Sequence, residues 1–347
     1  MTMERGAPRL TVLALAGALV LLVGCSNNGG GGDGDGPSAP SGSEGPAAST
    51  GPTGSRPGEV VATIEVGSDP IGVAAGEGSI WVVNAEIDSE RGSVSRIDPT
   101  TGEVVATPQV GGVPLEVAVG GGSVWVSNSG NDSVTRLDPS SNQDTAYVTV
   151  CAAPEGLTVA DGSVWVVCED DAVVARIDPR KNEMVAQIDV GLQPRFVTFA
   201  FGDIWVSSYF DGSITRIDPA TEKVVIEITT EQGPQIMAEA AGLLWVSTTD
   251  VDAVQAIDPE TNEVVATVET SVAPDGLAFD GTTLWVATES GPELVGIDPE
   301  TYEVVATAAV SDHGFINANQ VMVFEGGSLW LPIFDDGVVL RVAPPAM

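Results

Sequence analysis

The stretch Pro154-Glu155-Gly156-Leu157-Thr158-Val159-Ala160-Asp161-Gly162-Ser163-Val164-Trp165-Val166-Val167, followed by Ala175-Arg176-Ile177-Asp178-Pro179, decides the fold because it recurs. Each copy carries one tryptophan, with successive gaps of 44, 40, 40, 40, 40 and 45 residues between Trp81, Trp125, Trp165, Trp205, Trp245, Trp285 and Trp330. Asp-Pro pairs begin in the same phase at Asp98, Asp138, Asp178, Asp218, Asp258 and Asp298. A period of about 40 residues made of short β-branched runs is typical of a blade of four antiparallel strands. The seven tryptophans therefore predict an all-β, seven-bladed β-propeller.

The four strands of one blade can be assigned within the central repeat. The first is expected over residues 156–160 and the second over 163–167, joined by Asp161-Gly162, a dipeptide that favours a tight hairpin turn. The third is expected over 173–177 and the fourth over 183–190, with the Asp-Pro pair forming the turn between them.

The two ends of the repeat array complement each other. A copy of the fourth strand, Glu59-Val60-Val61-Ala62-Thr63-Ile64, stands before any blade has begun, and the last unit stops after a third strand, residues 338–342. Pairing the two would remove two sheet edges at once. We therefore expect residues 59–66 to supply the outer strand of the C-terminal blade and so close the ring.

The repeat also resembles a known group. The Gly-Ser-Val-Trp-Val and Ile-Asp-Pro-x-Thr-x-Glu-Val-Val-Ala-Thr units are similar to YncE/YVTN-type β-propeller repeats, whose ring resembles that of virginiamycin B lyase. The resemblance covers about residues 58–343 and implies the propeller fold. It does not assign an activity, because one propeller scaffold hosts lyases, lactonases and binding modules.

The N-terminal region predicts export and lipid anchoring. Arg5 and Arg9 precede an apolar run, and Leu22-Val23-Gly24-Cys25 resembles a lipoprotein signal, with cleavage before Cys25 and diacylation of its thiol. We expect residues 1–24 to be the signal peptide, 25–57 a flexible Gly/Ser/Pro tether and 58–347 the propeller. An ordinary signal peptide or an uncleaved anchor is the alternative. The expected location is the bacterial cell envelope, outside the cytoplasm, with the membrane reached through Cys25.

Charge and cysteine content narrow the choice of partners. The chain has 13 Lys and Arg against 49 Asp and Glu, a formal net charge of -36, which disfavours nucleic acid as a partner. If Cys25 carries lipid, Cys151 and Cys168 remain as a candidate disulfide in an oxidising compartment. Counting outward from the Asp161-Gly162 turn places Cys168 opposite Glu155, with Cys151 at the same end of the blade.

Two sets of residues stand out on the face opposite the Asp-Pro turns. The first blade has four extra residues within 84–92 and the seventh has five within 311–319, so two irregular loops are expected to meet at one seam. The residue after each repeat proline is expected at the mouth of the central funnel. In blades 1 and 2 this residue is apolar, Ile71 and Leu115. In the other blades it is polar: Glu155, Arg195, Gln235, Asp275 and Gln320, the last of which follows Asn319 in place of the proline. These polar residues are candidate ligand contacts, or a water-filled funnel satisfied internally. Tyr209, Phe210 and Phe334 break the pattern of the same loops and are further candidates.

Other recurring residues are interpreted as structural. The tryptophans keep a fixed phase and are expected between blades, and the arginines at 96, 136, 176, 216 and 341 are expected to pair with loop acids. Acidic loops at 169–171, 250–252 and 335–336 leave Mg²⁺ or Ca²⁺ binding open but lack the spaced ligands of a dedicated site.

Two function classes remain. The first is a lipid-anchored binding module that presents its loop face and funnel to a small molecule or an envelope protein and requires no cofactor. The alternative is a metal-dependent carbon-oxygen lyase or lactonase of the virginiamycin B lyase type, for which His313, the sole histidine, is the catalytic candidate. No phosphate-binding loop, nucleophile elbow or zinc spacing is present. The binding module is the interpretation we favour.

Overall fold

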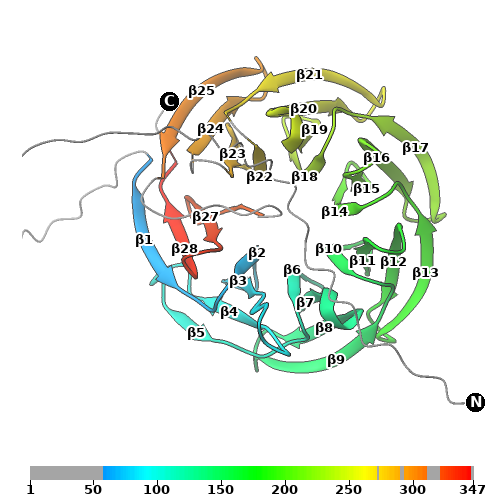
Figure 1. Cartoon of the computed structure of the whole chain (residues 1–347), viewed down its shortest axis with the longest axis vertical. Coiled ribbons are helices and arrows are strands. Elements are labelled where there is room, and N and C mark those ends of the chain that lie inside the picture. Colours follow the sequence, from blue (N-terminus) through cyan, green and yellow to red (C-terminus); the bar gives the residue numbers. More distant parts are fainter. Residues whose placement is uncertain (1–57, 272, 290–292, 311–320, 345–347) are drawn as a thin grey trace, which may run out of the picture. The chain divides into compact units, whose positions relative to one another are not determined.

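The structure, a computed structural model, describes residues 58–271, 273–289, 293–310 and 321–344. Within these residues the chain forms seven four-stranded antiparallel sheets, which stand as blades around a central axis (Figure 1). The predicted fold class is confirmed. The helices of the described residues are two short 3₁₀ turns, η1 (Ser129–Asn131) and η2 (Thr249–Val251), and neither is long and apolar enough to cross a membrane.

Each blade is a simple meander whose first strand lies nearest the axis and whose fourth lies at the rim (Figure 1). The first three blades contain β2 (Pro70–Gly76), β3 (Ser79–Asn84), β4 (Ser93–Ile97) and β5 (Val104–Ala106); β6 (Pro114–Gly120), β7 (Ser123–Asn128), β8 (Ser133–Asp138) and β9 (Gln143–Thr149); and β10 (Pro154–Ala160), β11 (Ser163–Cys168), β12 (Val173–Asp178) and β13 (Glu183–Asp189).

The remaining blades repeat the same order. They contain β14 (Pro194–Ala200), β15 (Asp203–Ser208), β16 (Ser213–Asp218) and β17 (Lys223–Thr229); β18 (Pro234–Ala240), β19 (Leu243–Thr248), β20 (Ala253–Asp258) and β21 (Glu263–Glu269); β22 (Pro274–Phe279), β23 (Leu284–Thr288), β24 (Glu293–Asp298) and β25 (Glu303–Ala309); and β26 (Val323–Glu325), β27 (Ser328–Ile333) and β28 (Val338–Val342) with β1 (Val60–Glu65).

The turns form as their residues dictate. Asp161 and Gly162 both have positive φ, 47° and 69°, as a two-residue hairpin of primed type requires. In the Asp-Pro turn of blade 1, Asp98 Oδ1 accepts hydrogen bonds from the backbone N–H groups of Thr100 and Thr101 at 2.7 and 3.1 Å. The aspartate thus caps the predicted Asp-Pro turn.

Ring closure by the N-terminal strand is confirmed. β1 pairs antiparallel with β28, from Val60 opposite Val342 to Glu65 opposite Val338, and the two strands lie side by side in Figure 1. Outside the ladder, the N–H of Gly58 donates to the carbonyl of Ala343 at 2.8 Å. Blade 7 therefore contains both ends of the array, and β28 is paired on both sides, with β27 and with β1, which forms the outer strand of the blade.

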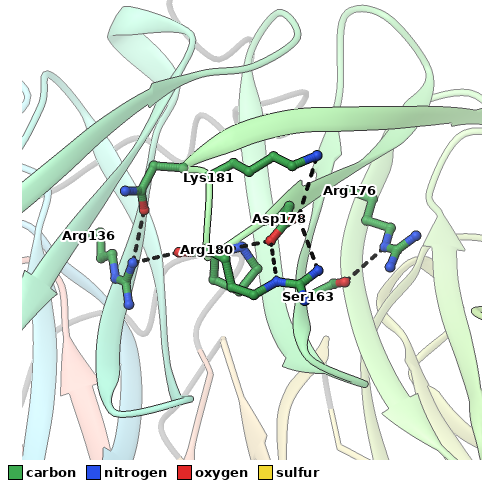
Figure 2. A network of polar contacts seen from close by, with 8 residues as sticks. Arg136, Ser163, Arg176, Asp178, Arg180 and Lys181 are labelled. Carbon is green, nitrogen blue, oxygen red and sulfur yellow. Dashed lines mark hydrogen bonds and ion pairs between the residues drawn. The ribbon is translucent and has the colours of Figure 1, made fainter.

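Tryptophans and arginines join neighbouring blades. All seven tryptophans are buried in the second strands, and the guanidinium of Arg136 lies 4.8 Å from the centroid of the Trp125 ring. The same Arg136 donates to the Pro179 carbonyl of the next blade at 2.7 Å, and Figure 2 shows it directed at the turn that carries Asp178. The expectation that these arginines pair with loop acids is wrong for Arg96 and Arg136, which bind carbonyl, amide and hydroxyl oxygens. Each of these two arginines donates to a proline carbonyl of the following blade, that of Pro139 or Pro179.

The two candidate cysteines are bonded to each other. Cys151 and Cys168 form a disulfide with a Cα–Cα distance of 5.7 Å, which links the segment before β10 to the last residue of β11. Cys168 lies opposite Pro154 and not opposite Glu155 as strict counting suggested, because the pairing of β10 with β11 is irregular between Pro154 and Leu157. This irregularity recurs in blades 1 to 6.

Candidate functional site

The inner strands surround a central channel that is largely apolar. A hollow of about 520 Å³ is lined by residues of β2, β6, β10, β14, β18, β22 and the segment around β26. Aliphatic and phenylalanine side chains make up most of the lining, including Phe196, Phe279 and Phe324, and the lining residues that the structure describes include no Lys, Arg or His. Apolar groups of a ligand can therefore pack against the channel walls.

One carboxyl group lies buried in this apolar wall. Glu116 is 6% exposed, and among the described residues its side chain accepts one hydrogen bond, from the N–H of Val117 to Oε1 at 2.8 Å. Burial raises the pKa of Glu116 to about 8, and the Val117 hydrogen bond opposes that shift. The channel thus contains an acid that holds its proton near neutral pH.

Glu116→Gln should change how stability depends on pH. The folded pKa, about 8, exceeds the ordinary value of 4.5, so between these limits the native state holds a proton that the unfolded state has lost. This group therefore lowers the free energy of unfolding as pH rises, by at most about 1.4 kcal/mol per pH unit. Urea unfolding at pH 5 and pH 7 should show the variant gaining stability relative to wild type at the higher pH. Parallel pH profiles for the two proteins would contradict this.

The mouth of the channel on the loop face carries a charged cluster. By the loop face we mean the side that bears the loops leading into the inner strands. Arg195 Nη1 lies 2.8 Å from Glu155 Oε1, and Arg195 Nη2 lies 3.3 Å from Glu169 Oε1. The side chains of Arg195 and Glu155 are 15% and 6% exposed, so the pair is buried. Burial raises the pKa of Glu155, and Arg195 counteracts that effect.

The cluster extends across blades 4, 5 and 6. The guanidinium of Arg195 lies 5.7 Å from the centroid of the Tyr209 ring, and Tyr209 donates its hydroxyl hydrogen to Asp250 Oδ1 at 2.6 Å. Burial raises the pKa of Glu289 to about 7, and the negative charge of Asp250 adds to that shift. We call Glu155, Glu169, Arg195, Tyr209, Asp250 and Glu289 the mouth cluster. It contains four carboxyl groups and one arginine.

Two polar atoms of the mouth cluster retain hydrogen-bonding capacity. Arg195 Nε and Glu289 Oε1 are buried, and neither has a hydrogen-bond partner among the described residues. One is a donor and the other an acceptor. Buried polar groups of this kind are costly unless they are paired.

The other predicted mouth residues are buried beside the cluster. Gln235 donates from its amide to Thr249 Oγ1 at 2.9 Å, and Thr249 donates to the Pro274 carbonyl at 2.9 Å. Asp275 is fully buried. The structure therefore brings Glu155, Arg195 and Tyr209 together and holds Gln235 by a neighbouring loop.

Several sequence candidates lie elsewhere or outside the described residues. Phe210 is 65% exposed, next to Tyr209 in the chain, and Phe334 is half-buried in the loop between β27 and β28. His313, Asn319 and Gln320 fall within 311–320, outside the described residues.

The insertion in blade 1 contacts blade 2. Arg91 Nε donates to the Val110 carbonyl at 2.7 Å, and Glu90 and Arg91 line an open hollow of about 850 Å³ with Asn131, Asp144 and Tyr147. The other insertion, expected to meet it at the seam with blade 7, falls on residues 311–320, outside the described part.

The acidic loops serve the backbone. Asp171 Oδ2 accepts from the N–H of Ala152 at 2.8 Å, and Asp252 Oδ1 accepts from the N–H of Ala273 at 2.8 Å. In the part of the chain that the structure describes, no group of three or more His, Cys, Asp or Glu is arranged to hold a metal ion. The sequence left metal binding open for these acidic loops. In the structure, at least two of their aspartates bind backbone N–H groups of neighbouring loops.

Sequence reasoning missed Glu116 and Glu289. A signal for Glu116 was present, because the second residue after the repeat proline is Gly72, Gly156 or Gly276 in three other blades. Glu289 lies four residues after Trp285, the repeat position that Tyr209 occupies after Trp205, so its position in the blade could be read from the sequence. Its place in the cluster follows from burial and from the proximity of Asp250.

Solved structures that resemble this chain include a hydrazine synthase and a streptogramin B lyase. Hydrazine synthase from Kuenenia stuttgartiensis has a TM-score of 0.69 at 17% sequence identity, covering 79% of this chain and 96% of that chain. A streptogramin B lyase structure has a TM-score of 0.68 at 15% identity, covering 81% of this chain and 96% of that chain. These likenesses confirm the predicted β-propeller fold and its similarity in fold to that of streptogramin B lyase. Neither the comparison with family models nor that with curated protein sequences yields a match.

Proposed function

We propose that the protein is a binding module that holds a small polar ligand at the mouth cluster on the loop face. The observation that carries the proposal is the buried donor Arg195 Nε and the buried acceptor Glu289 Oε1, neither of them paired among the described residues. A ligand that presents an acceptor and a donor, as an amide does, would satisfy both. The Tyr209 ring offers an aromatic surface beside them, and the exposed Phe210 lies next in the chain.

Arg195→Lys tests this function. Lysine keeps the positive charge beside Glu155 and Glu169 but lacks the Nε donor, so the fold should persist while the ligand loses one hydrogen bond. Wild type would be screened by thermal unfolding against amide-bearing small molecules and their matched esters. A bound amide at a hundred times its dissociation constant stabilises by about 2.7 kcal/mol. We expect at least half of that shift to disappear in Arg195→Lys.

Arg216→Lys is the matched control. Arg216 is also 15% exposed and pairs with Asp203 at 2.6 Å, but it stacks on Trp205 away from the mouth cluster. It should leave the ligand shift unchanged. An equal shift in wild type and Arg195→Lys, or no stabilising amide in the screen, would argue against the mouth cluster as the binding site.

We also propose that the protein is anchored outside the cytoplasm of a bacterium through Cys25. The lipobox-like sequence before Cys25 and the Gly/Ser/Pro-rich residues that follow it support this. Cys25→Ser should move the protein from the membrane fraction to the soluble envelope fraction. Retention in the membrane fraction would indicate another mode of attachment.

The lyase or lactonase alternative stays a prediction that depends on His313. The described residues fit a metal centre poorly, because none of their acids, cysteines or histidines form a group of three that could hold an ion. We therefore derive no catalytic step through a metal.

A further inference from the structure

Glu116 is a buried acid that the mouth cluster does not use. It lines the central channel, whereas none of the residues of the mouth cluster does. Its carboxyl has no ion-pair partner among the described residues, and Glu239, which is exposed, is the other titratable side chain in the lining. A carboxylate in such a position is costly to ionise without a cation beside it.

Gly72 of the neighbouring blade lies against this carboxyl. A Cβ at Gly72 would lie 2.7 Å from the Leu115 carbonyl oxygen and 2.8 Å from Glu116 Oε1, so only glycine fits there. At the equivalent position blades 4 and 5 carry the apolar side chains of Phe196 and Ile236. An apolar side chain can therefore occupy this position of a blade, so packing alone does not explain why blade 2 has a glutamate there.

The surroundings favour a cation as the partner. The chain has a formal net charge of -36, and the mouth cluster carries four carboxyl groups against one arginine. The excess of negative charge over the whole chain attracts cations to the protein. Beyond Glu116 the walls are hydrocarbon and aromatic, with Leu157, Leu277 and Phe279 among them.

We propose that the central channel binds an apolar amine, whose ammonium group pairs with the Glu116 carboxylate while its hydrocarbon part packs on the channel walls. This site goes beyond the mouth cluster and shares no residue with it. At neutral pH Glu116 holds a proton, so binding of the ammonium releases that proton to the buffer. The affinity should therefore rise between pH 6 and pH 8.

Isothermal titration of the full chain with n-hexylammonium at pH 7 tests the proposal, with n-hexanol as the uncharged probe of the same chain length. We expect hexylammonium to bind wild type at least tenfold more tightly than hexanol. Its apparent binding enthalpy should vary with the ionisation enthalpy of the buffer, because a proton is released. Glu116→Gln, which has nearly the same shape, should weaken hexylammonium binding at least tenfold and abolish the buffer dependence.

Two further variants test whether hexylammonium binding depends on Glu116 and not on another carboxyl group. Glu325→Gln removes an exposed carboxyl of β26 that does not line the channel, and it should bind hexylammonium as wild type does. Glu239→Gln tests the other carboxyl in the lining. The proposal is overturned if hexylammonium does not bind, if hexanol binds equally well, or if Glu239→Gln loses affinity while Glu116→Gln does not. The two wild-type titrations decide the matter even if Glu116→Gln does not fold.

Discussion

A chain that begins at residue 67 should lose most of its stability, because it lacks β1. Without that strand, β28 becomes an unpaired edge from Val338 to Val342. Ile64, 7% exposed, would also be lost from the cluster that contains Trp330 and Val339. Truncating one buried Ile to Ala typically costs about 2–5 kcal/mol, so loss of the whole strand should exceed about 5 kcal/mol. That is comparable with the entire stability of many domains.

The measurement is urea unfolding of two chains, one beginning at Gly58 and the other at residue 67. The longer chain retains the β1–β28 ladder and serves as the control. We expect a cooperative transition for it and a much lower midpoint, or no transition, for the shorter chain. The single variant Ile64→Ala should fall between them. Equal midpoints for the two chains would mean that ring closure contributes little to stability.

Arg195→Met should destabilise the protein strongly, because it leaves the Glu155 carboxyl buried without its cation. The side chain of Glu155 is only 6% exposed and lies 2.8 Å from Arg195. Removing one partner of a buried ion pair costs about 3–5 kcal/mol. The pKa of Glu155, already raised by burial, should rise further once Arg195 no longer opposes that effect.

The pH dependence and a double variant identify the cause. Because the folded pKa of Glu155 is raised further in the variant, the deficit relative to wild type grows as pH rises through the wild-type folded pKa, so it should be larger at the higher pH and shrink in acid. Replacing both residues, as Glu155→Gln with Arg195→Met, removes the buried charge and should recover most of the loss. Urea unfolding at pH 5 and pH 7 measures both effects. A deficit that is independent of pH and unchanged in the double variant would point to lost packing instead.

The position of the site residues on the ring could be predicted from the sequence, but their contacts with one another could not. Glu155 and Arg195 were placed at the channel mouth because they occupy one phase of the repeat, and repeat phase translates directly into position on a ring. Their pairing across neighbouring blades, and the extension through Tyr209 and Asp250 to Glu289, depends on side-chain reach between blades. Repeat phase contains no information on that reach.

The register of the inner strands shows the same limit on a smaller scale. Counting from the Asp161-Gly162 turn holds as far as Leu157 opposite Val166, and then the irregularity shifts Cys168 to Pro154. Local turn residues set the near end of a hairpin. The far end is also packed against the adjacent blade, where Gly156 closely approaches the Arg195 carbonyl and Phe196. The neighbour therefore influences a pairing that the hairpin alone does not specify.

The number of blades, the order of strands and the closure of the ring could all be predicted from the amino-acid sequence. Those features depend on a 40-residue period and on a complementary strand at each end, both of which are local patterns in the chain. The packing of the blades was needed to see which polar groups share a buried environment: Arg195 lies with two glutamates, and Glu116 is buried in the channel wall against Gly72. Burial and charge pairing depend on distances between segments from different blades, and these distances arise only when the blades pack into a ring.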